Sequence, residues 1–351
     1  MNVDLHHHGD RDVAPGLVDL AVNVRLPAPP PWLADTIAGS LHELGRYPDA
    51  APAVEAIAAR HGVDASSVLP TAGGAEAFTL VARGVRTARP VVVHPQFTEP
   101  EAALAAAGHD VGRCVLSRAT GFRLDPRPFA AGGEHAGADL VVVGNPTNPT
   151  GVLHRASDLR SLRAPGRLVV VDEAFMDAVP GETQSVIGPD LDGLLVVRSL
   201  TKTWGLAGLR AGYVVGDPAV VAALKAVQPP WSVSSPAVVA TVACLSERAV
   251  AEAEAGAMTI AVDREVLVRE LEAVGLRTAA PSDAPFVLVD TSPLGAASVR
   301  ADLAALGFAV RRGETFPGLG PTWVRLAVRD PETSRSVAAA FAELGRLRRV
   351  A

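Results

Sequence analysis

The chain has 351 residues and a formal net charge of −6, so it is long enough for one large domain plus a smaller one. The negative charge and the lack of a basic run argue against nucleic acid as the main partner, and no apolar stretch is long enough to span a membrane. The polar N-terminus does not resemble a secretory signal, so we expect a cytoplasmic protein.

The N-terminal arm contains three consecutive histidines, His6 to His8. No other histidines or cysteines in the sequence have a spacing suited to a metal, and a plain mobile arm explains this cluster equally well. We therefore expect no metal site.

A glycine pair, Gly73 and Gly74, opens a helical pattern that runs to about Arg86. Glycines at a helix start expose backbone N–H groups and the positive end of the helix dipole, which together attract an anion. Simple close packing is the alternative explanation, because the segment is neither a dinucleotide fingerprint nor a Walker loop.

Short apolar runs then alternate with helical patterns, which is typical of an α/β domain. The runs are Val91–Val93, Leu140–Val143, Leu168–Val171 and Leu194–Val197. Ligands of such folds bind at the carboxyl ends of the strands. The polar or aromatic residues just past these ends are Phe97, Asn145 with Asn148, Asp172 with Glu173, and Ser199 to Lys202.

Lys202 leaves the end of the last of these strands, close to Arg210. A lysine at the edge of a packed core and near another cation has a lowered pKa, which leaves free amine able to form a Schiff base. Ser199, Thr201 and Arg210 supply two hydroxyls and a guanidinium for a phosphate. A solvated surface lysine is the alternative, but the density of these groups favours a pyridoxal phosphate (PLP) enzyme.

Three further residues match what PLP chemistry requires. Asp172 follows a buried strand and can keep the pyridine nitrogen protonated, although a turn carboxylate is its ordinary role. Asn148, in a rigid proline-rich loop, can donate to the phenolic oxygen of the cofactor, and otherwise it is a turn residue. Phe97 can stack on the ring, although an isolated phenylalanine is usually part of a core.

The motifs N-P-T-N-P-T-G from Asn145, V-D-E-A-F from Val171 and S-L-T-K-T-W-G-L-A-G-L-R from Ser199 resemble, in order and spacing, those of the fold-type I PLP enzymes of the aspartate aminotransferase superfamily. The resemblance covers nearly the whole chain. It implies that Lys202 forms the Schiff base, with Asp172, Asn148 and Phe97 in the roles given above. It also implies a phosphate cup made of Gly74, Ala75, Ser199, Thr201 and Arg210.

The same resemblance implies how the substrate and a second subunit contribute. Tyr47 matches a tyrosine that reaches the cofactor phosphate of the neighbouring subunit, which implies a homodimer with shared active sites. Arg325 matches the arginine that binds the substrate carboxylate in a bidentate manner, whereas a surface position remains the simpler reading of the neighbouring Arg329.

Two branches of the superfamily resemble the chain, the histidinol-phosphate aminotransferases and the threonine-phosphate decarboxylases of cobalamin biosynthesis. Phe175 and the segment 229–234 favour the decarboxylase, as do His8 and Asn23 in the arm, which are similar to its substrate-binding elements. Residues 24–28 depart from the sequence that the two branches typically have at this place in the arm. Arg311 matches an arginine that meets the substrate phosphate in both branches.

We therefore predict a threonine-phosphate decarboxylase, with a histidinol-phosphate aminotransferase as the alternative and a non-catalytic PLP-binding regulator as a minor one. The chain lacks the DNA-binding pattern of such regulators and the glycine fingerprint of a dehydrogenase.

The resemblance also sets the expected architecture. We expect an N-terminal arm over 1–44 that joins the small domain, a large, mostly parallel α/β domain over 45–235, and a small α+β domain over 236–351.

Overall fold

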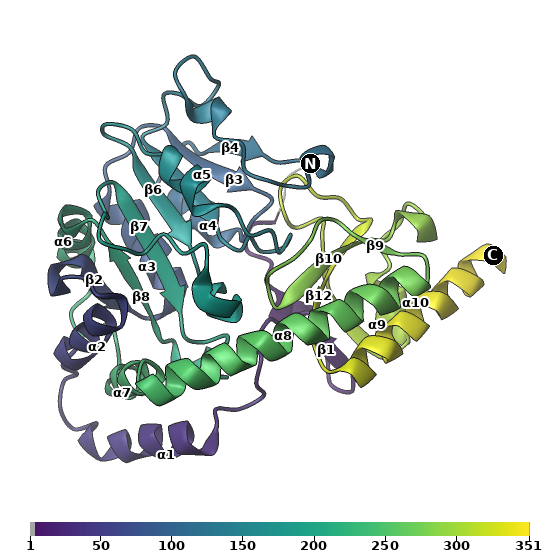
Figure 1. Ribbon diagram of the computed structural model, residues 1–351, viewed down its shortest axis with the longest axis horizontal. Coiled ribbons are helices and arrows are strands. Elements are labelled where there is room, and N and C mark those ends of the chain that lie inside the picture. The colour runs from purple at the N-terminus through teal and green to yellow at the C-terminus, as the bar shows by residue number, and fades with distance from the viewer. Residues whose placement is uncertain (1–3, 351) are drawn as a thin grey trace.

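The computed structural model describes residues 4–350 and is built on two β-sheets (Figure 1). The larger sheet has seven strands in the order β2-β8-β7-β6-β5-β3-β4. Neighbours within β7-β6-β5-β3-β4 are parallel, whereas β8 is antiparallel to both β7 and β2. The strands are β2 (Val68–Thr71), β3 (Pro90–His94), β4 (Gly112–Val115), β5 (Leu140–Gly144), β6 (Leu168–Asp172), β7 (Leu194–Ser199) and β8 (Gly212–Gly216).

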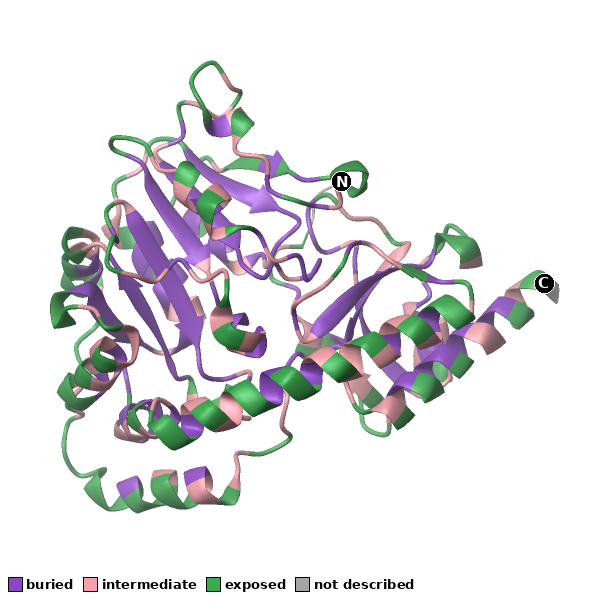
Figure 2. Cartoon of the chain, viewed as in Figure 1, coloured by how far each residue is buried: buried purple, intermediate pink, exposed green. Residues whose placement is uncertain are grey.

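Both faces of this sheet are covered, which explains why its strands read as continuous apolar runs rather than as alternating patterns. Along β6, Val169 and Val171 pack into one core cluster while Leu168 and Val170 pack into another on the opposite face. Figure 2 shows the central strands buried along their length. The surrounding helices are α2 (Ala51–His61), α3 (Gly73–Gly84), α4 (Glu99–Ala106), α5 (Ala156–Ser161), α6 (Pro218–Val227) and α7 (Ser235–Cys244).

The smaller sheet has five strands in the order β1-β11-β12-β10-β9 and brings the N-terminal arm next to the C-terminal part of the chain. Its strand β1 is parallel to β11, and the other neighbours are antiparallel. The strands are β1 (Val18–Leu20), β9 (Arg277–Thr278), β10 (Phe286–Asp290), β11 (Phe308–Arg312) and β12 (Trp323–Ala327).

The 27-residue helix α8 (Glu247–Ala273) runs from the region of α7 to the smaller sheet (Figure 1). There its apolar residues Leu267 and Leu271 pack in one core with the strands and with helices α9 (Arg300–Ala305) and α10 (Pro331–Val350). Helix α1 (Pro31–Gly39) of the arm packs against α7 at the other end of the molecule.

The expected fold class is confirmed, with a large, mostly parallel α/β sheet and a smaller α+β unit. The expected boundaries after residues 44 and 235 remain a prediction. Within residues 4–350, no helix is long and apolar enough to cross a membrane.

Candidate active site

The parallel strands β5, β6 and β7 end side by side, with Gly144 in register with Asp172, and Asp172 with Val197. A cavity of about 580 Å³ opens at these ends and is bounded on its other sides by the N-terminal arm and by β11 and β12. Its lining includes every site residue expected from the sequence except Tyr47. These residues are His8, Asn23, Gly74, Ala75, Phe97, Asn148, Asp172, Ser199, Thr201, Lys202, Arg210, Arg311 and Arg325.

Lys202 lines this cavity and is half-buried. Burial lowers the pKa of its amine to about 8, and the positive charges of Arg210 and Arg325 act in the same direction. The expected effect of Arg210 is therefore present, but loss of solvation is the larger cause. At pH 7 roughly a tenth of the amine is then neutral, which is the nucleophilic form, far more than for an ordinary lysine.

Asp172 ends β6 and faces the same cavity. Burial raises the pKa of its carboxyl to about 6, opposed by a hydrogen bond of 3.1 Å from the Ala174 N–H and by the charge of Lys202. A cation brought close to Asp172 would favour the carboxylate form, so the position suits a protonated ring nitrogen.

The first turn of α3 and the loop after β7 meet in this cavity. Gly73 has a φ of +77°, and a Cβ built on it would lie 2.7 Å from Nη2 of Arg210. The hydroxyls of Ser199 and Thr201 are 2.8 Å apart. Glycine at position 73 therefore lets the guanidinium lie directly over the helix start. The sequence singled out the glycine pair, but it could not show this approach.

Arg325 on β12 reaches from the smaller sheet into the cavity. Its Nη1 donates a hydrogen bond of 2.5 Å to Oδ1 of Asn148, and its Nη2 donates to the backbone carbonyl of Ala21 in the arm. Burial lowers the pKa of Arg325 well below its ordinary value, and the nearby charge of Arg311 adds to this. Arg325 is thus buried in the cavity. Arg329, four residues further along the chain, instead donates hydrogen bonds to backbone carbonyls of the arm.

Arg311 on β11 is held by the N-terminal arm. Its Nη2 donates a hydrogen bond of 2.7 Å to the carbonyl of His7, its Nη1 lies 3.5 Å from the Asp12 carboxylate, and its guanidinium lies over the ring of Phe316. Burial lowers the pKa of Arg311 to about 10, against the opposing charge of Asp12. The sequence did not indicate Asp12, because its arginine partners are about 300 residues away and leave no local pattern.

The cavity contains buried polar atoms that have no hydrogen-bond partner among residues 4–350. They include both side-chain polar atoms of Asn23 and Nε of Arg325, whereas Nη1 of Arg311 has only its ion pair with Asp12. Buried polar groups are nearly always satisfied in native proteins, so atoms left open in one cavity indicate a polar ligand. The donors among these atoms, together with the guanidinium of Arg210, fit an anionic substrate and an anionic cofactor.

Phe97 and His8 form one wall of the cavity, with ring centroids 5.6 Å apart. His8 also lies 3.6 Å from the carboxylate of Glu99, a residue that no sequence pattern indicated.

Within the described residues, no group of three or more histidines, cysteines or acids is arranged to hold a metal.

Tyr47 lies outside the cavity of its own chain. Its side chain is 76% exposed and stacks on Trp231, which is 59% exposed, with ring centroids 4.3 Å apart. A single chain therefore does not bring Tyr47 to the cofactor site, and its expected role would require a second copy.

Comparison with known proteins agrees with this geometry. Residues 15–341 match the family model described as Aminotransferase class I and II. A histidinol-phosphate aminotransferase of Mycobacterium tuberculosis is 46% identical over 338 residues, which cover 95% of this chain and 89% of the relative. A threonine-phosphate decarboxylase of Salmonella typhimurium is 33% identical over 225 residues, covering 62% of this chain and 61% of that protein.

Solved structures show the same fold. The aspartate aminotransferase of Thermus thermophilus with maleate superposes with a TM-score of 0.83 at 26% identity, covering 94% of this chain and 92% of that one. The histidinol-phosphate aminotransferase of Clostridium acetobutylicum superposes with a TM-score of 0.84 at 22% identity, covering 94% and 100%. The chain therefore belongs to the aminotransferase class I and II family and is a PLP-dependent enzyme, an aminotransferase or a decarboxylase.

Proposed function

We propose that the protein is an aminotransferase of the histidinol-phosphate type, which moves an amino group between a phosphorylated amine and a 2-oxo acid. The observation that carries this proposal is the pair of buried arginines, Arg311 and Arg325, which line the same cavity as Lys202. Two buried guanidinium groups suit substrates with a phosphate or two carboxylates. The higher identity and coverage of the aminotransferase relative favour this reaction over the decarboxylation that the sequence led us to expect.

The bound cofactor supplies an electron sink for the bond that breaks at the substrate Cα. In this proposal Lys202 holds the cofactor and then moves the proton at Cα. Asp172 keeps the ring nitrogen protonated, Asn148 donates to the phenolic oxygen, and Phe97 stacks on one face of the ring.

The cofactor phosphate would lie at the start of α3. The N–H groups of Gly74 and Ala75 would point toward it, and the helix dipole favours the negative charge. Ser199 and Thr201 would donate their hydroxyls, and Arg210 would supply the countercharge.

Recognition of the substrate would fall to residues from three parts of the chain. Arg325 would bind a carboxylate of the 2-oxo acid or amino acid, and Arg311 would bind the phosphate or the distal carboxylate. Asn23 and His8 from the arm would close the site over the substrate, because both line the cavity and the side-chain amide of Asn23 is otherwise unpaired among the described residues.

Threonine-phosphate decarboxylation is the second candidate. Phe175 lines the cavity and packs edge-on against Phe286, at a position where the aminotransferase branch typically has tyrosine. PLP enzymes cleave the Cα bond that lies perpendicular to the cofactor ring, so a small change in how Arg325 holds the carboxylate would select CO₂ loss instead of proton removal.

We also propose that the protein is a homodimer in the cytoplasm. The dimer is supported by the exposed pair of Tyr47 and Trp231, and by the exposed Leu41 and Leu44, which precede Tyr47 by a few residues in the chain. Burial of such a patch against a second copy would stabilise the dimer and would bring Tyr47 toward the cofactor phosphate of the partner. Sedimentation analysis that finds only monomer at micromolar concentration would refute this.

The reaction is tested by supplying each candidate substrate to the PLP-loaded protein. We expect glutamate to form from 2-oxoglutarate and histidinol phosphate, with no CO₂ release. Release of CO₂ from L-threonine phosphate in the absence of a 2-oxo acid, without amino transfer from histidinol phosphate, would reject the aminotransferase in favour of the second candidate. The variant Lys202→Ala serves as the control and should be inactive in both assays.

A further inference from the structure

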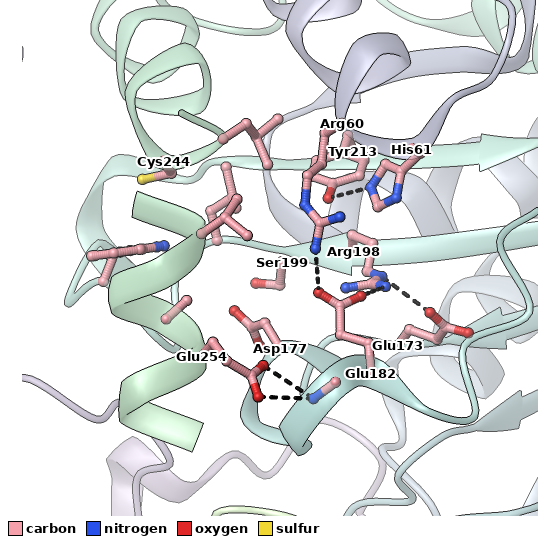
Figure 3. Close-up of a pocket in the computed structure, with 16 residues that line it drawn as sticks. Arg60, His61, Glu173, Asp177, Glu182, Arg198, Ser199, Tyr213, Cys244 and Glu254 are labelled. Carbon is pink, nitrogen blue, oxygen red and sulfur yellow. Dashed lines mark hydrogen bonds and ion pairs between the residues drawn. The ribbon is translucent and has the colours of Figure 1, made fainter. Parts of the chain in front are cut away.

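A second cavity, of about 220 Å³, lies behind the active site and is lined by charged side chains (Figure 3). Ser199 lines both cavities, so the two are separated by little more than the end of β7. Arg198 pairs there with Glu173 at 3.1 Å and with Glu182, which also pairs with Arg60 at 2.9 Å. Because these arginines and glutamates are paired with one another, we interpret the cavity as structural rather than as a ligand site, and we call Arg60, Glu173, Asp177, Glu182 and Arg198 the rear cluster.

Neighbouring residues of the chain face opposite cavities at two places. Asp172 lines the active site and Glu173 lines the rear cavity, and Lys202 lines the active site while Thr203 bonds to Asp177 of the rear cavity. Contacts in the rear cluster therefore act on the backbone that carries the active-site side chains.

Thr203 has the most direct connection to Lys202. Its hydroxyl donates a hydrogen bond to Oδ2 of Asp177, which lies on the 3-10 helix Met176–Ala178 just beyond β6. Thr203 is buried, and burial raises the pKa of the Asp177 carboxyl to about 6, while the bond from Thr203 opposes that rise. The carboxylate is thus a half-buried acceptor that receives its hydrogen bond from this hydroxyl.

The arm holds the same loop from its other side. The backbone N–H of Arg25 donates a hydrogen bond of 2.8 Å to the carbonyl of Lys202. The chain at residues 202–203 is therefore fixed between the arm and the rear cluster, and removal of one anchor would leave it free to move toward the other.

We propose that Asp177 and Thr203 are positioning residues, which hold the amine of Lys202 in the active-site cavity. The proposal rests on the assigned role of Lys202 as the cofactor lysine, and it is independent of which reaction follows.

The physical consequence concerns the solvation of the amine. Burial is the largest cause of the lowered pKa of Lys202, so a looser loop that admits water would raise this pKa from about 8 toward its ordinary value of 10.5. The charged groups that act on the amine come from four elements and would remain in place: Arg210, Arg325, Asp172 and Asp10. At pH 7.5 a rise of this pKa by about one would reduce the neutral fraction of the amine about eightfold.

The test measures, by absorbance, how fast the cofactor-free protein combines with added PLP. The rate is measured between pH 6.5 and about 10.5, a range that includes the Lys202 pKa of the wild type and the higher pKa expected of the variant. We expect Thr203→Val to combine five- to tenfold more slowly than the wild type at pH 7.5, with the midpoint of the rate profile about one unit higher. Thr203→Ser keeps the hydroxyl and should restore the rate to within about twofold of the wild type. Thr241→Val removes a buried hydroxyl that donates to the Ala237 carbonyl within α7, and it should leave the profile unchanged.

Other outcomes would overturn the proposal in distinguishable ways. If Thr203→Val has the same pH–rate profile as the wild type and only a lower Tm, the hydrogen bond between Thr203 and Asp177 stabilises the fold and does not position Lys202. If the midpoint of the rate profile shifts in Asp177→Asn but not in Thr203→Val, the negative charge of Asp177 is responsible, because the asparagine oxygen can still accept the hydrogen bond from Thr203. If Thr203→Val does not fold, Thr203→Ala leaves space for water beside Asp177 and permits the same comparison. Failure of the wild type itself to combine with PLP would instead refute the role of Lys202.

Discussion

Arg325 and Asn148 form a hydrogen bond of 2.5 Å that joins β12 of the smaller sheet to the loop after β5 of the larger one. The same guanidinium donates to the carbonyl of Ala21, so the arm and both sheets meet at one side chain. Because Arg325 is only 5% exposed, these bonds hold its fork in one orientation before substrate arrives.

Replacement of Arg325 by lysine should therefore be costly even though it keeps the charge. An ammonium group cannot donate to Asn148, to Ala21 and to a carboxylate in the fixed directions of the fork, so we expect kcat/KM to fall about 10- to 100-fold, or roughly 1.5–3 kcal/mol. Arg329→Lys is the matched control, and steady-state kinetics should show a loss below about threefold. Equal losses in the two variants would contradict a specific role for Arg325.

Arg311 should discriminate between phosphorylated and non-phosphorylated substrates. We expect Arg311→Gln to lower kcat/KM for the phosphorylated amine about 10- to 100-fold, since a charge-assisted bond is lost, and to affect a non-phosphorylated amino donor much less. Arg312 also pairs with Asp12, at 3.1 Å, but it does not line the cavity. Arg312→Gln should therefore leave the ratio of the two rates unchanged, and a similar change of ratio in both variants would refute the assignment.

Gly73→Ala should weaken PLP binding, because the new methyl group would displace the Arg210 guanidinium from the helix start. We expect the Kd for PLP to rise at least about tenfold, the typical loss of one charge-assisted contact. Gly62 also has a positive φ, of +62°, but a Cβ there has nothing within 4 Å. Gly62→Ala thus isolates the backbone strain, roughly 1 kcal/mol, and equilibrium dialysis should find its Kd unchanged. An equal rise in both variants would count against the proposed phosphate site.

Much of this architecture could be predicted from the sequence because its signals are local. The valine-rich runs correspond to β3, β5, β6 and β7, and the polar residues that follow them converge at one sheet edge as parallel strands require. The contacts that hold the site together are not local. Asp12 with Arg311, and Arg25 with Lys202, join segments far apart in the chain and leave no spacing pattern.

The identity of the reaction was the least predictable property. Phe175 and the arm residues favoured decarboxylation when read alone, whereas similarity over 95% of the chain favours the aminotransferase. Both reactions use the same lysine, ring partner and arginines, and they differ in the angle at which one bond is presented. A residue pattern does not encode such an angle.

The rate at which the cofactor-free wild type combines with PLP should depend on pH in a defined way. The pKa of Lys202 is lowered from 10.5 to about 8, so the reactive neutral amine accumulates as the pH rises through 8. We expect the rate to rise between about pH 7 and 9 and then to level off. A rate that keeps rising to about pH 10.5 would show that the reacting lysine is solvated in the ordinary way.

The claim that Lys202 carries the cofactor can be tested directly, because the chain contains only two lysines, Lys202 and the exposed Lys225. Borohydride reduction of the PLP-loaded protein, followed by peptide mass spectrometry, should find one pyridoxyl phosphate group per chain, on Lys202. It should remain there in Lys225→Arg and be absent in Lys202→Arg. A group on Lys225, or none on either lysine, would contradict the account.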